Sequence, residues 1–205
     1  MALDSVKEGN VVTQLVSKVK LPKMAKVRQI MDQSHIPIAD IPKTVKEELE
    51  RAGMRGRIKP GMSVAITAGS RGIANIAIIT KAIVDYVKDC GGEPFVFPAM
   101  GSHGGATAKG QLEILASYGI TEDFLGCPIK SSMEVVEIGT TETGMPVYVD
   151  KHAYEADGII LCGRVKAHTA FRGPYESGIL KMAVIGMGKQ KGADKEMMQF
   201  LDDSL

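Results

Sequence analysis

The sequence contains no tryptophan, and aromatic residues make up only 5% of its 205 positions. Platforms on which nucleobases could stack are therefore scarce. An excess of basic charge is also missing, because 25 lysine and arginine residues stand against 24 aspartate and glutamate residues, which gives a formal charge of +1. Domains that bind nucleic acids usually carry a clear basic excess. We therefore expect no nucleic-acid partner.

Cysteines are few and scattered. Cys90, Cys127 and Cys162 are the three in the sequence, and no two of them form a CxxC pair. This usage is typical of reduced thiols in a cytoplasmic protein and not of a disulfide framework. No apolar run approaches the roughly 18 residues of a membrane span, and residues 1–10 lack the apolar core of a secretory signal. These absences predict a cytoplasmic protein without a membrane partner.

The overall composition is that of a globular protein, with 44% hydrophobic and 24% charged residues. The length suits one large domain or two small ones. We expect residues 1–60 to form an N-terminal segment that packs on a main domain over residues 61–205. Within the first segment, Thr44 with Glu47 three residues later predicts the N-cap of a short helix that reaches Ala52.

The main domain alternates strand and helix patterns. Apolar runs predict buried strands over residues 62–67, 95–97 and 157–162, and two further strands over 134–138 and 146–149 joined by a polar turn. Apolar residues at helical spacing predict a helix over about 73–89 and another that ends near Gly119. This order predicts an α/β, Rossmann-like fold with a mostly parallel sheet and helices on both faces.

Ligands of such sheets bind beyond the carboxyl ends of the strands. Three loops leave those ends, at residues 69–75, 99–109 and 163–173. The side chains in them that could bind or react are Ser70, Arg71, Ser102, His103, Arg164, Lys166, His168 and Arg172. We expect His103, His168 and Arg71 to converge on one cleft.

Each loop has a functional and a structural interpretation. Arg71 beside a helix N-terminus suits a phosphate or a carboxylate, although it could also be a surface residue of a tight turn. His103 is followed by Gly104 and Gly105, whose bare backbone would let a ligand approach an imidazole that titrates near neutral pH. The alternative is a histidine that caps or fills the core.

His168 stands among cations, which would lower its pKa and keep it a neutral base or ligand. Histidines from two separate loops could flank a substrate carbon from opposite sides. Inverting a stereocentre by acid–base chemistry requires that arrangement.

Lysines follow the third loop. Lys181 stands in the apolar run 179–185, where a desolvated lysine could act as a nucleophile or an attachment point. The alternative is a lysine whose amine extends to solvent. Lys189 and Lys191, which adjoin glycines, are expected to face solvent. No HxxxH pattern or Cys/His cluster is present, so metal ligands stay unassigned.

Four segments resemble, in order and with similar spacing, the N-terminal domain of the nickel-dependent lactate racemase family: AGSR (68–71), PAMGSHGGAT (98–107), GRVKAH (163–168) and SGILK (177–181). The resemblance covers about residues 60–195. It implies the first domain of a two-domain protein, with the family's C-terminal domain absent. It also implies a nickel-pincer nucleotide that is tethered to a lysine and takes a hydride from the 2-carbon of a hydroxy acid. Two histidines exchange the hydroxyl proton.

By this resemblance His103 and His168 are the acid–base pair and Lys181 is the tether. Arg71 corresponds to the arginine of the substrate loop, and it is also expected, with Ser70, Gly104 and Gly105, to bind the cofactor. The implied enzyme is an isomerase, a racemase or epimerase of a lactate-like 2-hydroxy acid, with a small carboxylate as its substrate.

Some features of the family differ here. An acidic residue is expected just before Arg71, where Gly69 and Ser70 stand. The arginine expected directly after the first histidine is Gly104, and no histidine follows His168 as a nickel ligand. A non-catalytic module that binds an anionic nucleotide or carboxylate is therefore the main alternative. A sugar-phosphate or nucleotide enzyme without nickel is the other, and a homo-oligomer stays open.

Overall fold

The computed structural model describes residues 19–20, 22–166 and 177–202 of the chain. The chain divides into two compact units, Met1–His35 and Ile36–Leu205. The described residues of the first unit contain no helix or strand. All elements named below belong to the second unit, so the helices between residues 38 and 57 are part of the main body. The expectation that the chain before them packs on this body stays a prediction.

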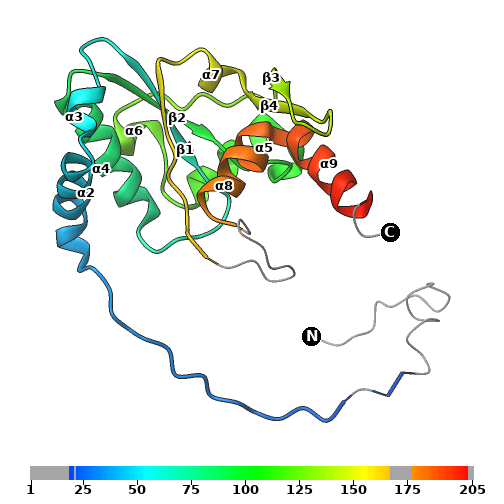
Figure 1. Ribbon diagram of the computed structural model, residues 1–205. Helices are drawn as coiled ribbons and strands as arrows, with labels where there is room; N and C mark the ends of the chain where they lie inside the picture. The colour runs from blue at the N-terminus through cyan, green and yellow to red at the C-terminus, as the bar shows by residue number, and fades with distance from the viewer. Residues whose placement is uncertain (1–18, 21, 167–176, 203–205) are drawn as a thin grey trace. The chain divides into compact units, whose positions relative to one another are not determined.

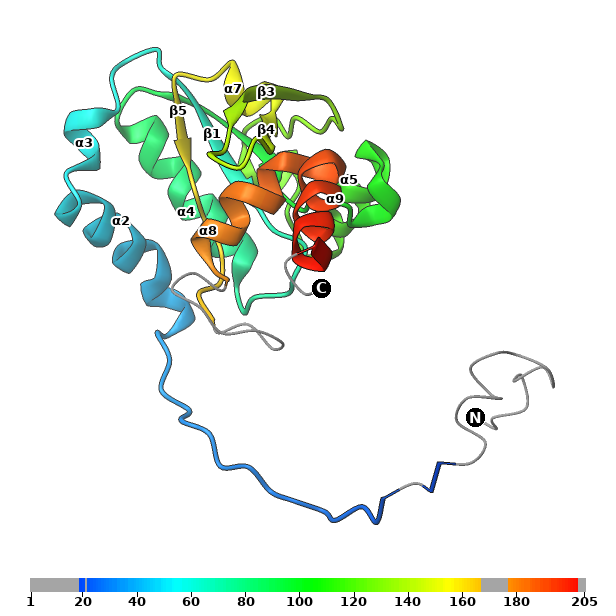
Figure 2. The ribbon, with the colours of Figure 1, turned by 45° about the vertical axis from the view of Figure 1, so that its right-hand side comes forward.

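Three strands form the parallel sheet that positions the site. They are β1 (Ser63–Ala68), β2 (Glu93–Pro98) and β5 (Gly158–Ile160), in the order β2-β1-β5 (Figures 1 and 2). Both pairings are parallel, with Ala65 opposite Phe95 and Ile159. The α/β class and the three strands are thus confirmed. The other two predicted strands, β3 (Val135–Thr140) and β4 (Pro146–Asp150), form a separate antiparallel hairpin.

The other regular elements of the described body are helices. They are η1 (Ile38–Asp40), α2 (Ile41–Arg51), α3 (Met54–Arg57), α4 (Ile76–Asp89), η2 (Gly104–Ala106), α5 (Ala108–Ser117), α6 (Glu122–Leu125), α7 (Lys151–Tyr154), α8 (Ile179–Lys181), the π-helical turn η3 (Met182–Gly186) and α9 (Met187–Asp202). Within the described ranges, every helix is too short or too polar to span a lipid bilayer.

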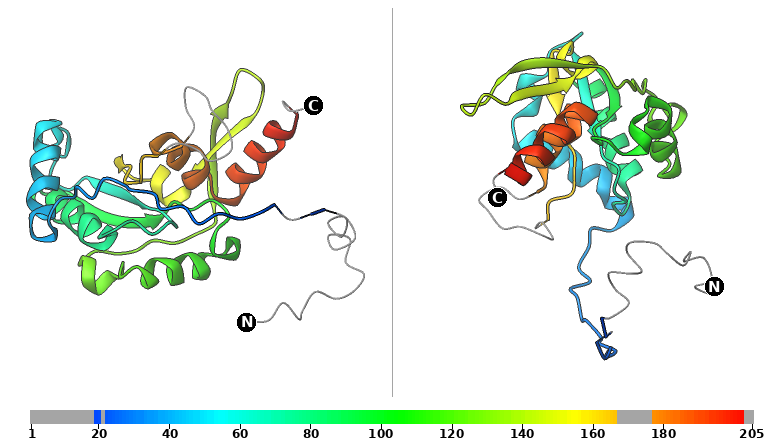
Figure 3. Two further views of the ribbon diagram at one scale, coloured as in Figure 1. Left: turned by 90° about the horizontal axis from the view of Figure 1, so that it is seen from below. Right: turned by 90° about the vertical axis from the view of Figure 1, so that its right-hand side faces the viewer.

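Alternate residues of the strands face two different cores. On one face, Val64, Ile66 and Val96 pack in a cluster that includes Val84 of α4 and Leu115 of α5. Because successive strand residues point to opposite faces, the residues between them build a second core. The left view of Figure 3 shows α5 on one side of the sheet and the β3–β4 hairpin with the C-terminal helices on the other.

The second core lies under the hairpin and the C-terminal helices. Ala65, Phe95 and Phe97 pack there with Val149 of β4, and Met182 of η3 packs against them. Helices therefore contribute to both faces, as predicted, but on this face they share the cover with the hairpin. A strand that is buried on both faces needs a nearly continuous apolar run, and β1 and β2 show one.

The predicted N-cap at Thr44 is wrong. Helix α2 begins at Ile41, after Asp40, and Pro42 lies in its first turn, where a missing N–H costs nothing. Thr44 is inside the helix, and its Oγ1 donates a hydrogen bond to the carbonyl oxygen of Asp40 at 2.9 Å. Glu47 pairs instead with Lys43 at 3.8 Å. The proline thus starts the helix three residues before the expected cap.

Candidate active site

The three expected loops leave the same edge of the sheet, because β1, β2 and β5 run parallel. The first two loops are described completely, and the third is described as far as Lys166. His168 lies outside the described residues, so its place opposite His103 stays a prediction. The site below is built from the first two loops and the C-terminal segment.

The first loop holds the His103 ring in place. Ser70 Oγ is hydrogen-bonded to His103 Nδ1, and the main-chain carbonyl of Ser70 accepts a hydrogen bond from Tyr118 Oη at 2.8 Å. Nε2 of the ring has no hydrogen-bond partner among the described residues. A neutral imidazole whose Nδ1 is bonded in this way presents Nε2 to a substrate. Ser70, expected to bind the cofactor, therefore orients the histidine.

The main chain around His103 is held by a buried glutamine of α5. Gln111 is fully buried, and its Nε2 donates to the carbonyl oxygens of Gly101 at 3.0 Å and of His103 at 3.2 Å. A buried amide that meets two carbonyls fixes the path of the loop, since each broken bond would leave a buried polar group without a partner. No local sequence pattern indicates this role of Gln111.

Two cations lie close enough to His103 to change its protonation. Partial burial is the largest cause that holds the pKa of His103 below its ordinary value, and the positive charges of Arg71 and Lys181 add to it. Each of these causes disfavours a charged imidazole. His103, Arg71 and Lys181 therefore form one electrostatic cluster. The predicted convergence of His103, His168 and Arg71 on one cleft stays a prediction.

Met182 packs against glycines at the strand ends. A Cβ atom added at Gly69 would lie 3.1 Å from Met182 Cε, and one at Gly163 would lie 3.0 Å from it. Gly101 N also donates to the carbonyl oxygen of Gly186 at 3.3 Å. The π-helical turn therefore lies across the ends of all three strands, a type of turn that is frequent at functional sites.

The side chain of Lys181, which directly precedes this turn, is exposed to solvent. The interpretation of a desolvated lysine inside an apolar run is therefore wrong for this residue, because the helical turn directs Met182 to the sheet and leaves Lys181 outside. Its amine is accessible for attachment to a ligand while its charge still influences His103.

The two glycines after His103 differ in their surroundings. A Cβ atom at Gly104 would lie only 2.6 Å from the carbonyl carbon of Gly110 in α5, and Gly104 has φ +69°. No larger residue fits there without a shift of the backbone. Gly105 has open space beside it. Binding of the cofactor by these two residues stays a prediction.

Lys189 differs most from expectation. It was predicted to face solvent, but its side chain is fully buried, with Nζ 2.9 Å from Asp150 Oδ2. Its backbone has φ 54° and ψ −150°, a conformation that costs a residue other than glycine about 1–3 kcal/mol. That backbone turns the side chain inward. Lys191, in contrast, is exposed as predicted.

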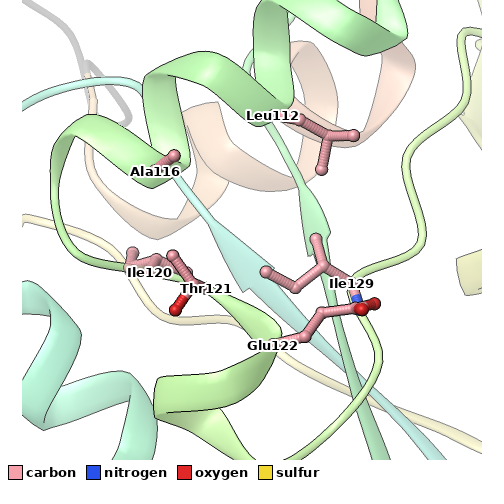
Figure 4. Close-up of a pocket in the computed structure, with 6 residues that line it drawn as sticks. All are labelled: Leu112, Ala116, Ile120, Thr121, Glu122 and Ile129. Atoms are coloured by element: carbon pink, nitrogen blue, oxygen red, sulfur yellow. The ribbon is translucent and has the colours of Figure 1, made fainter.

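Two pockets lie away from this cluster. One, of about 310 Å³, lies between α5 and the chain around Thr121 and Ile129 (Figure 4). The other, of about 520 Å³, is lined by residues that include Ile138, Tyr154 and Ile159. Neither contains a residue of the three loops. Among the described residues no group of three or more His, Cys, Asp or Glu side chains could hold a metal ion.

A comparison with known families finds one match. The family model of the lactate racemase N-terminal domain matches residues 13–201. The chain belongs to this family. No curated protein sequence matches it significantly. The match begins well before the segment in which we noted the resemblance, and it includes both described loops and Lys181.

Membership of the lactate racemase family gives the cluster a context. The residues expected to act in such a domain were His103, His168, Arg71 and Lys181. Arg71 and Lys181 both influence the pKa of His103 through their charge, and the roles of all four residues stay predictions. Gln111, Tyr118 and Lys189 support them and were not singled out as site residues from the sequence.

Proposed function

We propose that this chain takes part in the racemisation or epimerisation of a lactate-like 2-hydroxy acid, with His103 and His168 as the acid–base pair. Lys181 would carry a nickel-pincer nucleotide. The observation that supports this most directly is the cluster of His103, Arg71 and Lys181 at the carboxyl ends of the strands. The proposed reaction would need a proton-transfer group, a partner for the carboxylate and an attachment point for the cofactor, and these three residues could supply them.

The described residues fit the organic part of that cofactor. Lys181 is exposed and can form a covalent bond, and with Arg71 it offers positive charge to an anionic nucleotide. The described part of the chain offers no cluster of metal ligands, so no protein ligand is assigned to nickel. When bound, the cofactor would supply a reversible hydride acceptor for the 2-carbon of the substrate.

His103 is suited to accept the hydroxyl proton. Its lowered pKa means that the ring is neutral at neutral pH, and its Nδ1 is hydrogen-bonded to Ser70. With Nδ1–H donating to Ser70 Oγ, Nε2 is the unprotonated ring nitrogen that takes the proton from the 2-hydroxyl group. Arg71 would bind the carboxylate of the substrate as an ion pair and fix the 2-carbon near the ring. His168 would exchange the hydroxyl proton from the other side of the substrate.

Loading of the site would make His103 a stronger base. A bound carboxylate compensates the charge of Arg71, and an amide-type bond at Lys181 removes the charge of that amine. Both cations hold the pKa of His103 down in the free chain. Their neutralisation would raise the pKa of His103 and so favour proton uptake only when cofactor and substrate are in place.

Covalent loading of Lys181 tests the proposal. The chain is produced in cells that also make the enzymes of cofactor synthesis, and the product is examined by intact-mass spectrometry and metal analysis. Wild-type protein and Lys191→Ala should carry the same adduct, and Lys181→Ala should carry none. Lys191 is a matched control, since it is also exposed and lies in the same C-terminal segment. Normal loading of Lys181→Ala would refute the tether.

Turnover of the loaded protein tests the histidine. His103→Ala should keep the adduct and lose a factor of about 10² to 10⁴ in kcat, which corresponds to about 3–5 kcal/mol. An unchanged kcat would exclude His103 as acid or base. A chain that binds 2-hydroxy acids, carries no adduct and shows no turnover in any of these cells would instead support the non-catalytic binding module.

A further inference from the structure

Lys189 is the centre of a buried polar network. Its ammonium donates to the carbonyl oxygen of Pro98 and to Gln111 Oε1, the latter at 3.3 Å, and lies 2.9 Å from Asp150 Oδ2. The Lys189 and Asp150 side chains are both completely buried. Asp150 Oδ2 has no hydrogen-bond partner among the described residues, so its contact with Lys189 is an ion pair without an aligned hydrogen bond.

The network reaches the loop that carries His103, residues 99–109, through two routes. Pro98 is the last residue of β2 and directly precedes that loop, so the bond to its carbonyl fixes the start of the loop. Gln111, which accepts from Lys189, donates in turn to the carbonyls of Gly101 and His103. Lys189 therefore acts on both the start of the loop and the residue that carries the imidazole.

The same lysine is part of the segment that carries Lys181. Elements α8, η3 and α9 follow one another without a break from Ile179, and Lys189 interrupts the regular helix near the start of α9. The rest of this segment touches the loop through apolar contacts and the bond from Gly101 N to the carbonyl of Gly186. The ammonium of Lys189 makes hydrogen bonds to the Pro98 carbonyl and to Gln111 Oε1, which are directional, whereas apolar contacts allow sliding.

The strained backbone at Lys189 is consistent with such a role. Glycine would adopt φ 54° without strain, and the residues on either side of Lys189 are Gly188 and Gln190. Glycine, however, has no side chain that could reach Pro98, Gln111 and Asp150. Strain of this kind persists where the surrounding contacts over-determine it, and it clusters at functional sites.

We propose that Lys189 is a positioning residue that fixes the turn carrying Lys181 against the loop carrying His103. The inference rests on the proposed roles of Lys181 and His103. Without the Lys189 side chain, the turn with Lys181 and the loop with His103 would still fold onto the sheet, because the apolar cores remain. The tether and the base would, however, lose their fixed separation. Asp150 holds Lys189 in place as its counter-ion.

The test uses variants that keep the core filled. Lys189→Met removes the amine, and Asp150→Asn keeps the oxygen that accepts from the main-chain N–H groups of His152 and Ala153 at 2.8 and 3.1 Å. The double variant Lys189→Met with Asp150→Asn leaves no unpaired buried charge, so it should fold. Lys191→Met makes the same chemical change at an exposed lysine two positions further on and is the matched control.

The readout is the ring of His103 in NMR titrations of the full chain without ligand, assigned with a His103→Gln variant. In the double variant the pKa of His103 should rise towards that of an ordinary imidazole, because Lys181 and the burial that lower it are no longer fixed beside the ring. The Lys191→Met control should titrate like the wild type. A folded double variant with an unchanged His103 titration would overturn the proposal.

A second variant covers the case in which the double variant does not fold. Gln111→Met leaves the ion pair and the Pro98 bond intact and removes the route through Gln111, including its bond from Lys189, so it should shift the same His103 resonances. An unshifted ring in folded Gln111→Met would also overturn the proposal. These titrations need no turnover. They can therefore succeed or fail independently of the kcat of His103→Ala, which tests the proposed function.

Discussion

The buried pair of Lys189 and Asp150 should be strongly coupled in stability. We consider Lys189→Met, Asp150→Asn and the double variant. Each single substitution leaves one buried charge without its partner, which costs about 3–5 kcal/mol of unfolding free energy. The loss for Lys189→Met should lie at the lower end of this range, since Asp150 Oδ1 keeps its two main-chain hydrogen bonds. For Asp150→Asn the loss is limited because burial already lowers the pKa of Lys189, which can release its proton.

The double variant should lose less than the two single variants together. Its remaining cost comes from the carbonyl of Pro98 and from Gln111 Oε1, which lose the donor that Lys189 provided. An unsatisfied buried acceptor costs about 1–3 kcal/mol. The sum of the two single losses should therefore exceed the loss of the double variant by about 3 kcal/mol, which is the coupling energy of the pair.

Urea unfolding followed by far-UV circular dichroism measures these differences, since the chain has no tryptophan for fluorescence. The exposed pair of Lys151 and Glu134 is the control, because its atoms are almost as close, at 3.0 Å, but its side chains are 44% and 67% exposed. Its coupling should be below about 1 kcal/mol. A coupling of Lys189 with Asp150 that is no larger than this would show that the pair is solvated and would refute the reasoning.

Two further predictions concern His103. Ser70→Ala removes the hydrogen bond to Nδ1, which is worth about 0.5–1.5 kcal/mol, so kcat of the loaded protein should fall roughly 2- to 13-fold. Ser117→Ala, on the exposed side of α5, should leave kcat unchanged, and equal rates for the two variants would contradict an orienting role of Ser70. Because the folded-state pKa of His103 lies below its ordinary value of 6.5, the unfolded chain binds the proton more readily, and stability should decrease as the pH falls through 6.5 towards the lowered value. His103→Gln should lose this part of the pH dependence in urea midpoints, and an identical slope in both proteins would contradict it.

Much of the sheet could be predicted from the sequence for a simple physical reason. Strands such as β1 and β2 are buried on both faces, so they appear as short continuous apolar runs between turn signals. The loops that follow are rich in glycine because the π-helical turn and α5 come within contact distance of their main chain. Knowing that the strands are parallel is enough to place Arg71 and His103 at one edge.

The supporting contacts of the site could not be predicted in this way. Ser70 and Tyr118 act through hydrogen bonds between segments far apart in the chain, and such pairs leave no local pattern. Gln111 bonds to carbonyls only 8 and 10 residues earlier, but no known motif has this spacing. Thr44 fits the local rule for an N-cap, but a proline two residues earlier already starts the helix. In both cases the contact that decides the structure involves a residue that the local motif does not contain.

Lys181 and Lys189 show most clearly where local reasoning ends. Their neighbours suggest that the first is buried and the second exposed, because one stands in an apolar run and the other beside a glycine. The structure reverses this, since helical periodicity places Lys181 on the outer face and a single residue with positive φ turns Lys189 inward. A buried lysine needs a carboxylate and acceptors around it, and here these come from β4, α5 and the end of β2. The lysine that meets solvent is then free to react, and the lysine that is buried can hold the reactive one in place.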